Sequence, residues 1–435
     1  MMAKRGSAVM LSLVFLVGFV VVAGAANSAD KSIPAGTAIT TQNWQQYKDF
    51  MSVGLQSFFN GQSPFKFGSN FRMVVGPYHH YPVPSVYAAN TEKYSGQIKI
   101  EALPDGGHVI RDYVAGLPFP NPQAPLRGWK VLVNLWYRFV PWEECEPAWY
   151  IYLVDRLGNE HITAGKLSYR RFAHISDPVK PISDPAGPGI DYSEFLGLIL
   201  PEEAKYTSQL TLYYDNPLKP EDLFVFIPAL RRSLRLSAAS RCAPVAGSDL
   251  TQDDIHTGFN GGIIRWTVKF LGQGQVLALY ETDPKVYGIR ANYNKFLFPM
   301  PAIGQWEVRP VDVIDVRRVP SQQAGYCYGK RVMYIDTETW ANLWSDLYDS
   351  AGKLWKVQMI SHPPGKIPLI GYTSDAGNFI EPIWDLQNAH ASTAVSAAPN
   401  GETVRNNQDC ASYDGVNYTD AARFNTVQAL SEIMR

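Results

Sequence analysis

A short alternation of apolar and polar side chains constrains the fold more than any other feature of this chain. Between residues 264 and 270 the apolar members are Ile264, Trp266, Val268 and Phe270, and the polar members are Arg265, Thr267 and Lys269. A period of two places successive side chains on opposite faces, which is typical of a β-strand with one buried face. The sequence therefore predicts a sheet that buries one side of this segment.

Runs of aromatic and β-branched residues, separated by turns, recur along most of the chain. Pairs such as Asp105-Gly106 and Gly158-Asn159 provide the residues that tight turns require. The expected strands cover residues 97–103, 108–114, 130–140, 148–155, 161–174, 206–215, 223–228, 230–237, 264–270, 305–319, 330–336, 342–349, 353–360 and 378–388. The expected strands do not alternate with helices, as they would in a parallel sheet, so the sequence gives no sign of a parallel sheet. We predict a mainly β fold: a large curved antiparallel sheet or unclosed β-barrel, with a few helices packed in or on it.

Two segments have the spacing of amphipathic helices. Apolar residues recur every three or four positions in 44–59 and again in 419–434, which predicts a helix near each end of the chain. Residues 63–94 are rich in aromatic residues, proline and glycine, which predicts an ordered loop over an apolar surface. We expect residues 26–96 to form an N-terminal helix and wrapping segment, in one structural domain with the half-barrel of residues 97–435.

The first residues resemble an export signal. Lys4 and Arg5 precede an apolar run over residues 9–22, and small residues follow at 23–25. Residues 1–25 are therefore predicted to be a cleaved signal peptide, which would deliver the protein to the periplasm. The balance of 39 basic and 40 acidic side chains argues against a nucleic-acid partner.

Four cysteines fit an oxidising compartment. Cys145, Cys242, Cys327 and Cys410 could form two disulfides, and the sequence leaves all three pairings open. None has the spacing of a metal site. The adjacent His79 and His80 would point to opposite sides of an extended chain, so the sequence predicts no metal site and no cofactor.

Recognised catalytic motifs are also missing from the sequence. Acidic residues at Asp312, Asp315 and 336–338 could supply a carboxylate pair for glycoside hydrolysis, but their linear spacing does not show one. We therefore predict no catalytic residues. Asp249, Asp253 and Asp254 are expected to pair with arginines or to be solvated, rather than to bind calcium.

The segment 224–241 carries four arginines. Arg231, Arg232 and Arg235 lie within five residues, and Arg241 follows. One interpretation is a solvated strand face. The other is that planar guanidinium groups hold an anionic head group or acidic residues elsewhere in the fold.

Several separated motifs resemble one known family. They are AGLPFPNP at 115–122, FIPALRRSLRLS at 226–237, DLTQDDIHTGFNG at 249–261, KRVMYIDTETW at 330–340 and LYDSAGKLWK at 347–356. They are similar to a proteobacterial family of unassigned function, often described as outer-membrane lipoprotein-sorting-like. The resemblance implies a fold like that of the periplasmic Lol-type lipoprotein carriers, an unclosed antiparallel barrel with an apolar cavity. It also implies an inner-membrane exporter of the resistance-nodulation-division type as a partner. This chain departs from such carriers in its greater length, its N-terminal aromatic region and its proline-rich loops.

The sequence thus favours a periplasmic carrier that binds a lipid or other hydrophobic molecule without covalent chemistry. Its expected ligand-binding residues are Arg231, Arg232 and Arg235 at the rim, with Trp136, Tyr214, Trp266 and Trp355 facing inward. Two alternatives remain open: a secreted carbohydrate-active hydrolase or lyase, and a structural subunit of an envelope assembly.

Overall fold

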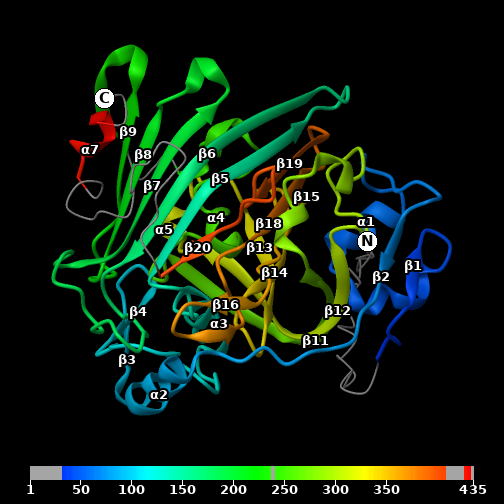
Figure 1. Ribbon diagram of the computed structural model, residues 1–435. Coiled ribbons are helices and arrows are strands. Elements are labelled where there is room, and N and C mark those ends of the chain that lie inside the picture. The colour runs from blue at the N-terminus through cyan, green and yellow to red at the C-terminus, as the bar shows by residue number, and fades with distance from the viewer. Residues whose placement is uncertain (1–31, 237–240, 408–425, 433–435) are drawn as a thin grey trace, which may run out of the picture.

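One large antiparallel sheet organises the protein, as the computed structural model shows (Figure 1). The structure describes residues 32–236, 241–407 and 426–432. The sheet has 14 strands in the order β10-β9-β8-β7-β6-β5-β19-β18-β15-β14-β13-β12-β11, with β20 paired to β5. Its strands are β5 (Glu143–Val154), β6 (Glu160–Arg171), β7 (Ile190–Leu200), β8 (Ser208–Tyr214), β9 (Asp222–Ile227), β10 (Arg232–Leu236), β11 (Trp266–Thr282), β12 (Gly304–Arg318), β13 (Lys330–Asp336), β14 (Asn342–Tyr348), β15 (Leu354–Met359), β18 (Ile380–Asp385), β19 (His390–Val395) and β20 (Arg405–Asn406).

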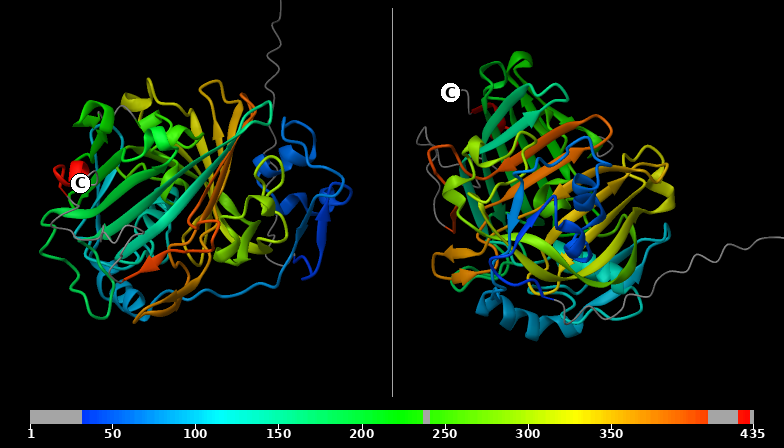
Figure 2. Two further views of the ribbon diagram at one scale, coloured as in Figure 1. Left: turned by 45° about the horizontal axis from the view of Figure 1, so that its top comes forward. Right: turned by 90° about the vertical axis from the view of Figure 1, so that its right-hand side faces the viewer.

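The sheet curves strongly but does not close (Figures 1 and 2). Its two edge strands, β10 and β11, follow each other along the chain yet lie at opposite ends of the strand order. We call the described connection between them, residues 241–265, the strap. The predicted fold class, an unclosed antiparallel β-sheet with few helices, is confirmed.

Smaller elements surround this sheet. Three two-stranded sheets pair β1 (Ala38–Thr40) with β2 (Arg72–Val74), β3 (Lys99–Ala102) with β4 (His108–Arg111), and β16 (Gly365–Ile367) with β17 (Gly371–Thr373). The α-helices are α1 (Val53–Phe59), α2 (Ser85–Tyr94), α3 (Arg127–Trp136), α4 (Ile255–Gly258), α5 (Pro320–Gln323) and α7 (Ala429–Glu432). The 3₁₀ turns are η1 (Trp44–Phe50), η2 (Ser95–Gln97), η3 (Glu202–Ala204), η4 (Pro228–Leu230), η6 (Val245–Gly247), η7 (Pro284–Val286) and η8 (Arg290–Asn292). None of the helices in these described ranges is long and apolar enough to cross a membrane.

Side chains on both faces of the sheet are buried along its central strands, such as β14 and β18. Along β5, Tyr152 and Val154 belong to one apolar cluster, while Trp149 and Ile151 belong to another. Neighbouring side chains of a strand point to opposite faces, so the two clusters lie on opposite sides of the sheet. We call the side of Tyr152 the N-terminal face and the side of Trp149 the cavity face.

The N-terminal face is covered by residues 33–81 and 284–303. Aromatic rings carry much of this packing: Phe58 lies 5.0 Å from Trp384 between ring centroids, and Phe298 lies 5.8 Å from Trp306. Helix α1 begins at the cap Ser52, whose side chain accepts from the Leu55 amide. The aromatic N-terminal segment thus packs on an apolar surface of the sheet, and its assignment to one domain with the half-barrel stays a prediction.

The cavity face is covered by α3 and by the strap. Helix α3 packs against β11 and β12, and Gly128 lets its backbone approach closely, since a Cβ there would lie 2.7 Å from the Phe270 amide nitrogen. A disulfide between Cys242 and Cys327 fastens the start of the strap. Cys145 is also in a disulfide, and Cys410 lies outside the described residues.

Most strand predictions are confirmed, and three secondary-structure predictions are wrong. Residues 130–140 were expected to form a strand, but α3 occupies most of this range, because apolar residues on both sides of the helix are buried. The expected helix over 44–59 is divided into η1 and α1 at Ser52, which caps the second piece. The expected loop over 63–94 contains β2 and α2. The predicted leader and most of the predicted C-terminal helix lie outside the described residues.

Candidate functional site

A cavity of about 120 Å³ lies on the cavity face, between the strap and the strands β5, β6 and β7. Further lining comes from β8, β18, β19 and the segment 362–379. Its walls are formed by Arg138, Val140, Glu144, Glu146, Trp149, Ile151, Leu167, Tyr169, Glu194, Leu196, Gln209, Val245, Leu250, Ile255, His256, His362, Asp375, Gly377, Phe379, Glu381 and Ala394. The cavity therefore joins an apolar wall to a floor of ionisable groups.

A bulge in β5 brings the two parts together. The pairing of β5 with β6 shifts between Glu146 and Trp149. An extra residue in one strand changes which side chains face a given side. Glu144 and Glu146 before the bulge, and Trp149 and Ile151 after it, consequently all line the same cavity.

The apolar wall is built around Trp149. Its indole lies against β6 at Gly165, where a Cβ would come within 2.4 Å of the ring. Leu250 of the strap and Ala394 of β19 belong to the same apolar cluster. The exposed fraction of the Trp149 side chain is 4%, and its indole N–H has no hydrogen-bond partner among the described residues.

Two carboxyl groups on the floor lack compensating cations in contact. Burial and the neighbouring Asp375 raise the pKa of Glu144 to about 8. Burial, followed by Glu144 and Glu194, raises the pKa of Glu146 well above its ordinary range. Oε2 of Glu146 has no hydrogen-bond partner in the described part of the chain. Burial thus favours the neutral form of both carboxyl groups, and a neutral carboxyl group can donate as well as accept a hydrogen bond.

A histidine and two acidic side chains form the next part of the floor. His362 Nε2 lies 3.1 Å from Glu381 Oε1, and its Nδ1 lies 3.4 Å from Asp375 Oδ2. Burial alone would lower the pKa of His362, but Asp375 and Glu381 raise it to about 9. The imidazolium is therefore the charged partner of these two carboxylates at neutral pH.

The strap adds a second histidine. His256 Nε2 makes a close ion pair with Glu194 Oε1, and its ring lies 5.7 Å from that of Tyr192. His256 and Thr257 have φ values of 56° and 61°, in the left-handed region that non-glycine residues seldom occupy. This backbone conformation directs the imidazole of His256 to the cavity.

The three predicted rim arginines lie elsewhere. Arg231, Arg232 and Arg235 are exposed, at or beside the edge strand β10, and none lines the cavity. Arg235 pairs with Asp222 on β9. Positive charges on an edge strand hinder its pairing with another chain. Binding of an anionic head group by these arginines stays a prediction, and it would have to occur outside the cavity.

The four predicted aromatic residues are separated from one another. Trp266 is fully buried in the core under α3, and Trp355 donates to Asp385. Trp136 and Tyr214 line a second, smaller cavity of about 40 Å³ with Arg265 and Glu221. None of the four lines the large cavity. Their role in ligand binding also stays a prediction.

The acidic residues that could have formed a hydrolytic pair have arginine partners instead. Asp312 pairs with Arg127 at 3.2 Å, Asp315 with Arg317 at 2.8 Å. Asp336 and Glu338 both contact Arg309, each at 2.7 Å. The expected pairing of these strap carboxylates with the arginine segment 224–241 is confirmed for Asp253, which contacts Arg241 and also Arg318. Asp254 instead pairs with Arg331, outside that segment.

Sequence reasoning missed the cavity floor, although a signal was present. Glu144 and Glu146 interrupt a strand, Glu194 stands in the run DYSEFLGLIL, and Glu381 stands in FIEPIWD. A carboxylate in an otherwise apolar strand that is buried on both faces is seldom tolerated without a purpose. Only the fold shows that these strands converge.

Together, the sheet and this cavity define a class of protein: an open antiparallel half-barrel with an internal cavity that is apolar on one side and polar on the other. The chain belongs to the family described as protein of unknown function (DUF1329), which matches residues 38–428. No curated protein matches the chain.

Solved structures with related folds are distant. A DUF1329 family protein from Desulfovibrio piger is 15% identical, with a TM-score of 0.46 over 70% of this chain and 97% of that one. A putative outer membrane lipoprotein-sorting protein domain from Vibrio parahaemolyticus is 13% identical, with a TM-score of 0.46 over 70% and 99%. A LolA superfamily protein from Nitrosomonas europaea is 12% identical, with a TM-score of 0.35 over 62% and 89%. All three scores are below 0.5, so the functional argument rests on the cavity itself.

Proposed function

We propose that this protein is a periplasmic carrier that binds a hydrophobic molecule without covalent chemistry, in the cavity between the strap and β5–β7. The observation that carries the proposal is the composition of the lining, in which the apolar Trp149, Ile151 and Leu250 border the same cavity as Glu144 and Glu146. Pockets of this kind bind ligands by burial of apolar surface and orient them through a few polar groups.

The size of the cavity limits the part of the ligand that it encloses. A dry protein cavity of roughly 150 Å³ holds a benzene ring, and this one measures about 120 Å³. The enclosed part is therefore about one ring or a short branched chain. Burial of roughly 100 Å² of such a group would contribute about 2.5 kcal/mol to binding.

The floor determines the polar end of the ligand. Among the described residues, Glu146 Oε2 is a buried acceptor without a hydrogen-bond partner, and Trp149 Nε1 is a buried donor without one. A buried polar atom without a partner costs free energy that a ligand hydrogen bond would recover. Burial keeps Glu144 and Glu146 neutral because a negative charge is unfavourable in this place, and the same burial disfavours a ligand carboxylate or phosphate. The ligand is thus an amphiphile whose polar end is a hydroxyl or an amine, not a carboxylate or phosphate.

A set of matched probes tests this proposal. We expect the full chain to bind a medium-chain alcohol and the corresponding primary amine at least roughly tenfold more tightly than the fatty acid of equal length, a difference of about 1.4 kcal/mol. Isothermal titration calorimetry would measure the three affinities. Native mass spectrometry of protein purified from its own host would identify the natural ligand.

Two variants locate the binding. Replacing Ala394 with Leu fills the apolar wall and should abolish binding of all three probes, whereas Arg232→Met on the edge strand should leave binding unchanged. Equal binding by Ala394→Leu and wild-type protein would overturn the proposal. Loss of binding in Arg232→Met, with tighter binding of the fatty acid, would instead support a head-group site at the arginines.

Delivery to the periplasm depends on the leader predicted over residues 1–25. The exporter partnership implied by the family resemblance has no observation within the described ranges to support it. It forms no part of this proposal.

A further inference from the structure

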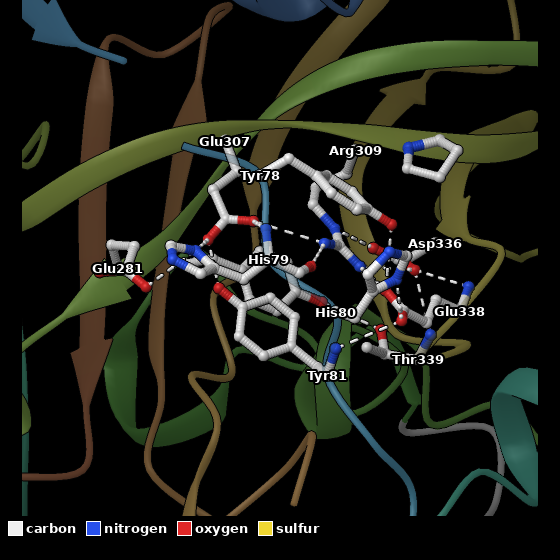
Figure 3. A network of polar contacts seen from close by, with 12 residues as sticks. Tyr78, His79, His80, Tyr81, Glu281, Glu307, Arg309, Asp336, Glu338 and Thr339 are labelled. Atoms are coloured by element: carbon white, nitrogen blue, oxygen red, sulfur yellow. Dashed lines mark hydrogen bonds and ion pairs between the residues drawn. The ribbon is translucent and has the colours of Figure 1, made fainter. Parts of the chain in front are cut away.

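A second group of polar residues lies on the segment from Tyr78 to Tyr81, away from the cavity (Figure 3). This segment passes over the ends of β11, β12 and β13. Figure 3 shows His79 directed at Glu281 and Glu307, while His80 is directed at Glu338. The two adjacent histidines therefore have separate surroundings.

The contacts of His79 converge on one nitrogen. Its Nδ1 lies 3.1 Å from Glu281 Oε1 and 3.1 Å from Glu307 Oε1. The three ligand atoms of this group all lie within 4.8 Å of one another. If Nδ1 carries a proton, its single N–H bond is shared between the two oxygens and is poorly aligned with at least one of them.

We propose that His79, Glu281 and Glu307 form a binding site for a divalent metal ion of the zinc class. Zinc bound tetrahedrally at about 2.0–2.2 Å by nitrogen and carboxylate oxygen places its ligand atoms roughly 3.3–3.6 Å apart. The two observed separations of 3.1 Å from His79 Nδ1 are a few tenths of an ångström shorter, so a small outward movement of the side chains would accommodate the ion. One histidine and two carboxylates also leave at least one coordination position for water.

The groups behind these ligands hold them in place. Tyr81 donates a short hydrogen bond to Glu307 Oε1, and the His79 amide donates to Glu307 Oε2 at 3.3 Å. Arg309 donates to the His79 carbonyl at 2.6 Å, which fixes the backbone from which the imidazole extends. Partners of this kind orient the ligands of metal sites.

Charge also favours a cation at this place. Glu307 is fully buried, and Arg309 Nη1 lies 3.4 Å from its Oε2, but the same guanidinium is also engaged by Asp336 and Glu338. Glu281 adds a further carboxylate, so the acidic groups outnumber the arginine. Two carboxylates held near one imidazole nitrogen repel each other unless a positive charge lies between them.

The cavity histidine provides a useful contrast. His362 also contacts two carboxylates, but it does so through opposite ring nitrogens, Nδ1 toward Asp375 and Nε2 toward Glu381. A single ion cannot lie between carboxylates on opposite sides of a ring. In the described part of the chain, His79 is the histidine whose geometry suits a metal.

Sequence reasoning missed this site because its ligands come from distant segments. His79 lies on an extended segment before the main sheet, whereas Glu281 ends β11 and Glu307 begins β12. The expectation that the two adjacent histidines cannot share an ion leaves open a site for one of them with partners from elsewhere.

Zinc titration of the full chain tests the proposal. The protein is first treated with a chelator, and it must lack a histidine affinity tag. We expect calorimetry to show one ion bound per chain with a dissociation constant below about 10 μM. Cobalt, as a spectroscopic probe, should give a visible absorption band that zinc displaces.

Matched variants assign the ligands. His79 and Glu281 are about 40% exposed, so His79→Gln and Glu281→Gln should fold normally and weaken zinc binding at least roughly tenfold. His80→Gln is the control and should bind as wild type. Absence of saturable zinc or cobalt binding below about 100 μM would overturn the proposal, as would equal weakening by His79→Gln and His80→Gln. Because the site lies outside the cavity, neither result bears on the binding of alcohols or amines.

Discussion

The strap and the cavity floor both bury carboxylates on the same face of the sheet, but they neutralise them in different ways. In the strap, Asp253 contacts Arg241 and Arg318; burial would raise its pKa, but these arginines lower it to about 2. On the floor, burial raises the pKa of Glu144 to about 8. A buried carboxylate with arginines stabilises the fold, whereas one left without a cation is available to a ligand.

The largest expected effect comes from breaking the strap. Arg331 and Asp254 are both fully buried and lie 2.8 Å apart. Replacing Arg331 with Met leaves Asp254 without its cation and should lower the free energy of unfolding by about 3–5 kcal/mol. Urea denaturation measures this change. The exposed Arg231→Met serves as control, and its free energy of unfolding should stay within about 0.5 kcal/mol of wild type. Equal losses in the two variants would show that the buried pair of Arg331 and Asp254 does not stabilise the strap more than an exposed arginine does.

The free energy of unfolding should depend on pH in opposite directions for the cavity floor and for the strap. His362 has a pKa raised to about 9, so its stabilisation is complete below about pH 6.5 and disappears as pH rises through 9. The raised pKa of Glu144, about 8, acts in the same direction between about pH 4.5 and 8. The lowered pKa of Asp253, about 2, gives stability that is present above about pH 3.8 and is lost toward pH 2.

We therefore expect the floor to lose stability in alkali and the strap to lose it in acid. Denaturation curves at a series of pH values should show an alkaline loss of about 1–3 kcal/mol. His362→Gln should flatten the alkaline part and leave the acid part unchanged. A variant with the same alkaline slope as wild type would show that His362 does not carry this effect.

The smallest expected effect is on the floor itself. Glu146 has a raised pKa and an acceptor atom without a partner. Glu146→Gln keeps the shape and removes the ionisable group, so stability should change by less than about 1 kcal/mol, with an increase at alkaline pH. Thermal unfolding at pH 6 and pH 9 would measure it. A loss comparable to that of Arg331→Met would mean that Glu146 belongs to the structural network.

The sequence predicted the sheet much better than the site. The alternation around Trp266 predicted a strand with one buried face. The structure has this pattern in the first part of β11, where exposed residues alternate with buried or partly buried ones. The same reasoning failed for α3, since Val131, Leu132 and Leu135 pack on one side, while Trp129 and Val133 pack on the other. A segment that is apolar all round hides its period.

Site prediction failed for a different physical reason. The arginines at 231–235 attract attention because they are adjacent in sequence, yet their strand lies at an edge and their side chains meet solvent. Glu146 and Glu381 are unremarkable in sequence and meet only after β5 and β18 enter one sheet. Residues that are close together in the sequence therefore need not form a site, and residues that form one can be far apart in the sequence.

The strand order also describes a ring with one seam. In the sheet, β5 to β10 pair in succession, β11 to β19 pair in their order along the chain apart from the separate β16–β17 hairpin, and β19 pairs with β5. The pair missing from a complete circle is β10 with β11, the two strands joined by the strap. The pairing of β5 with β19, in which Val154 lies beside Ala391, joins segments that are far apart in the sequence. Pairing of β5 with β19 therefore requires that most of the chain has been made, and among the described strands of this sheet β10 and β11 are the two edges that no pairing closes.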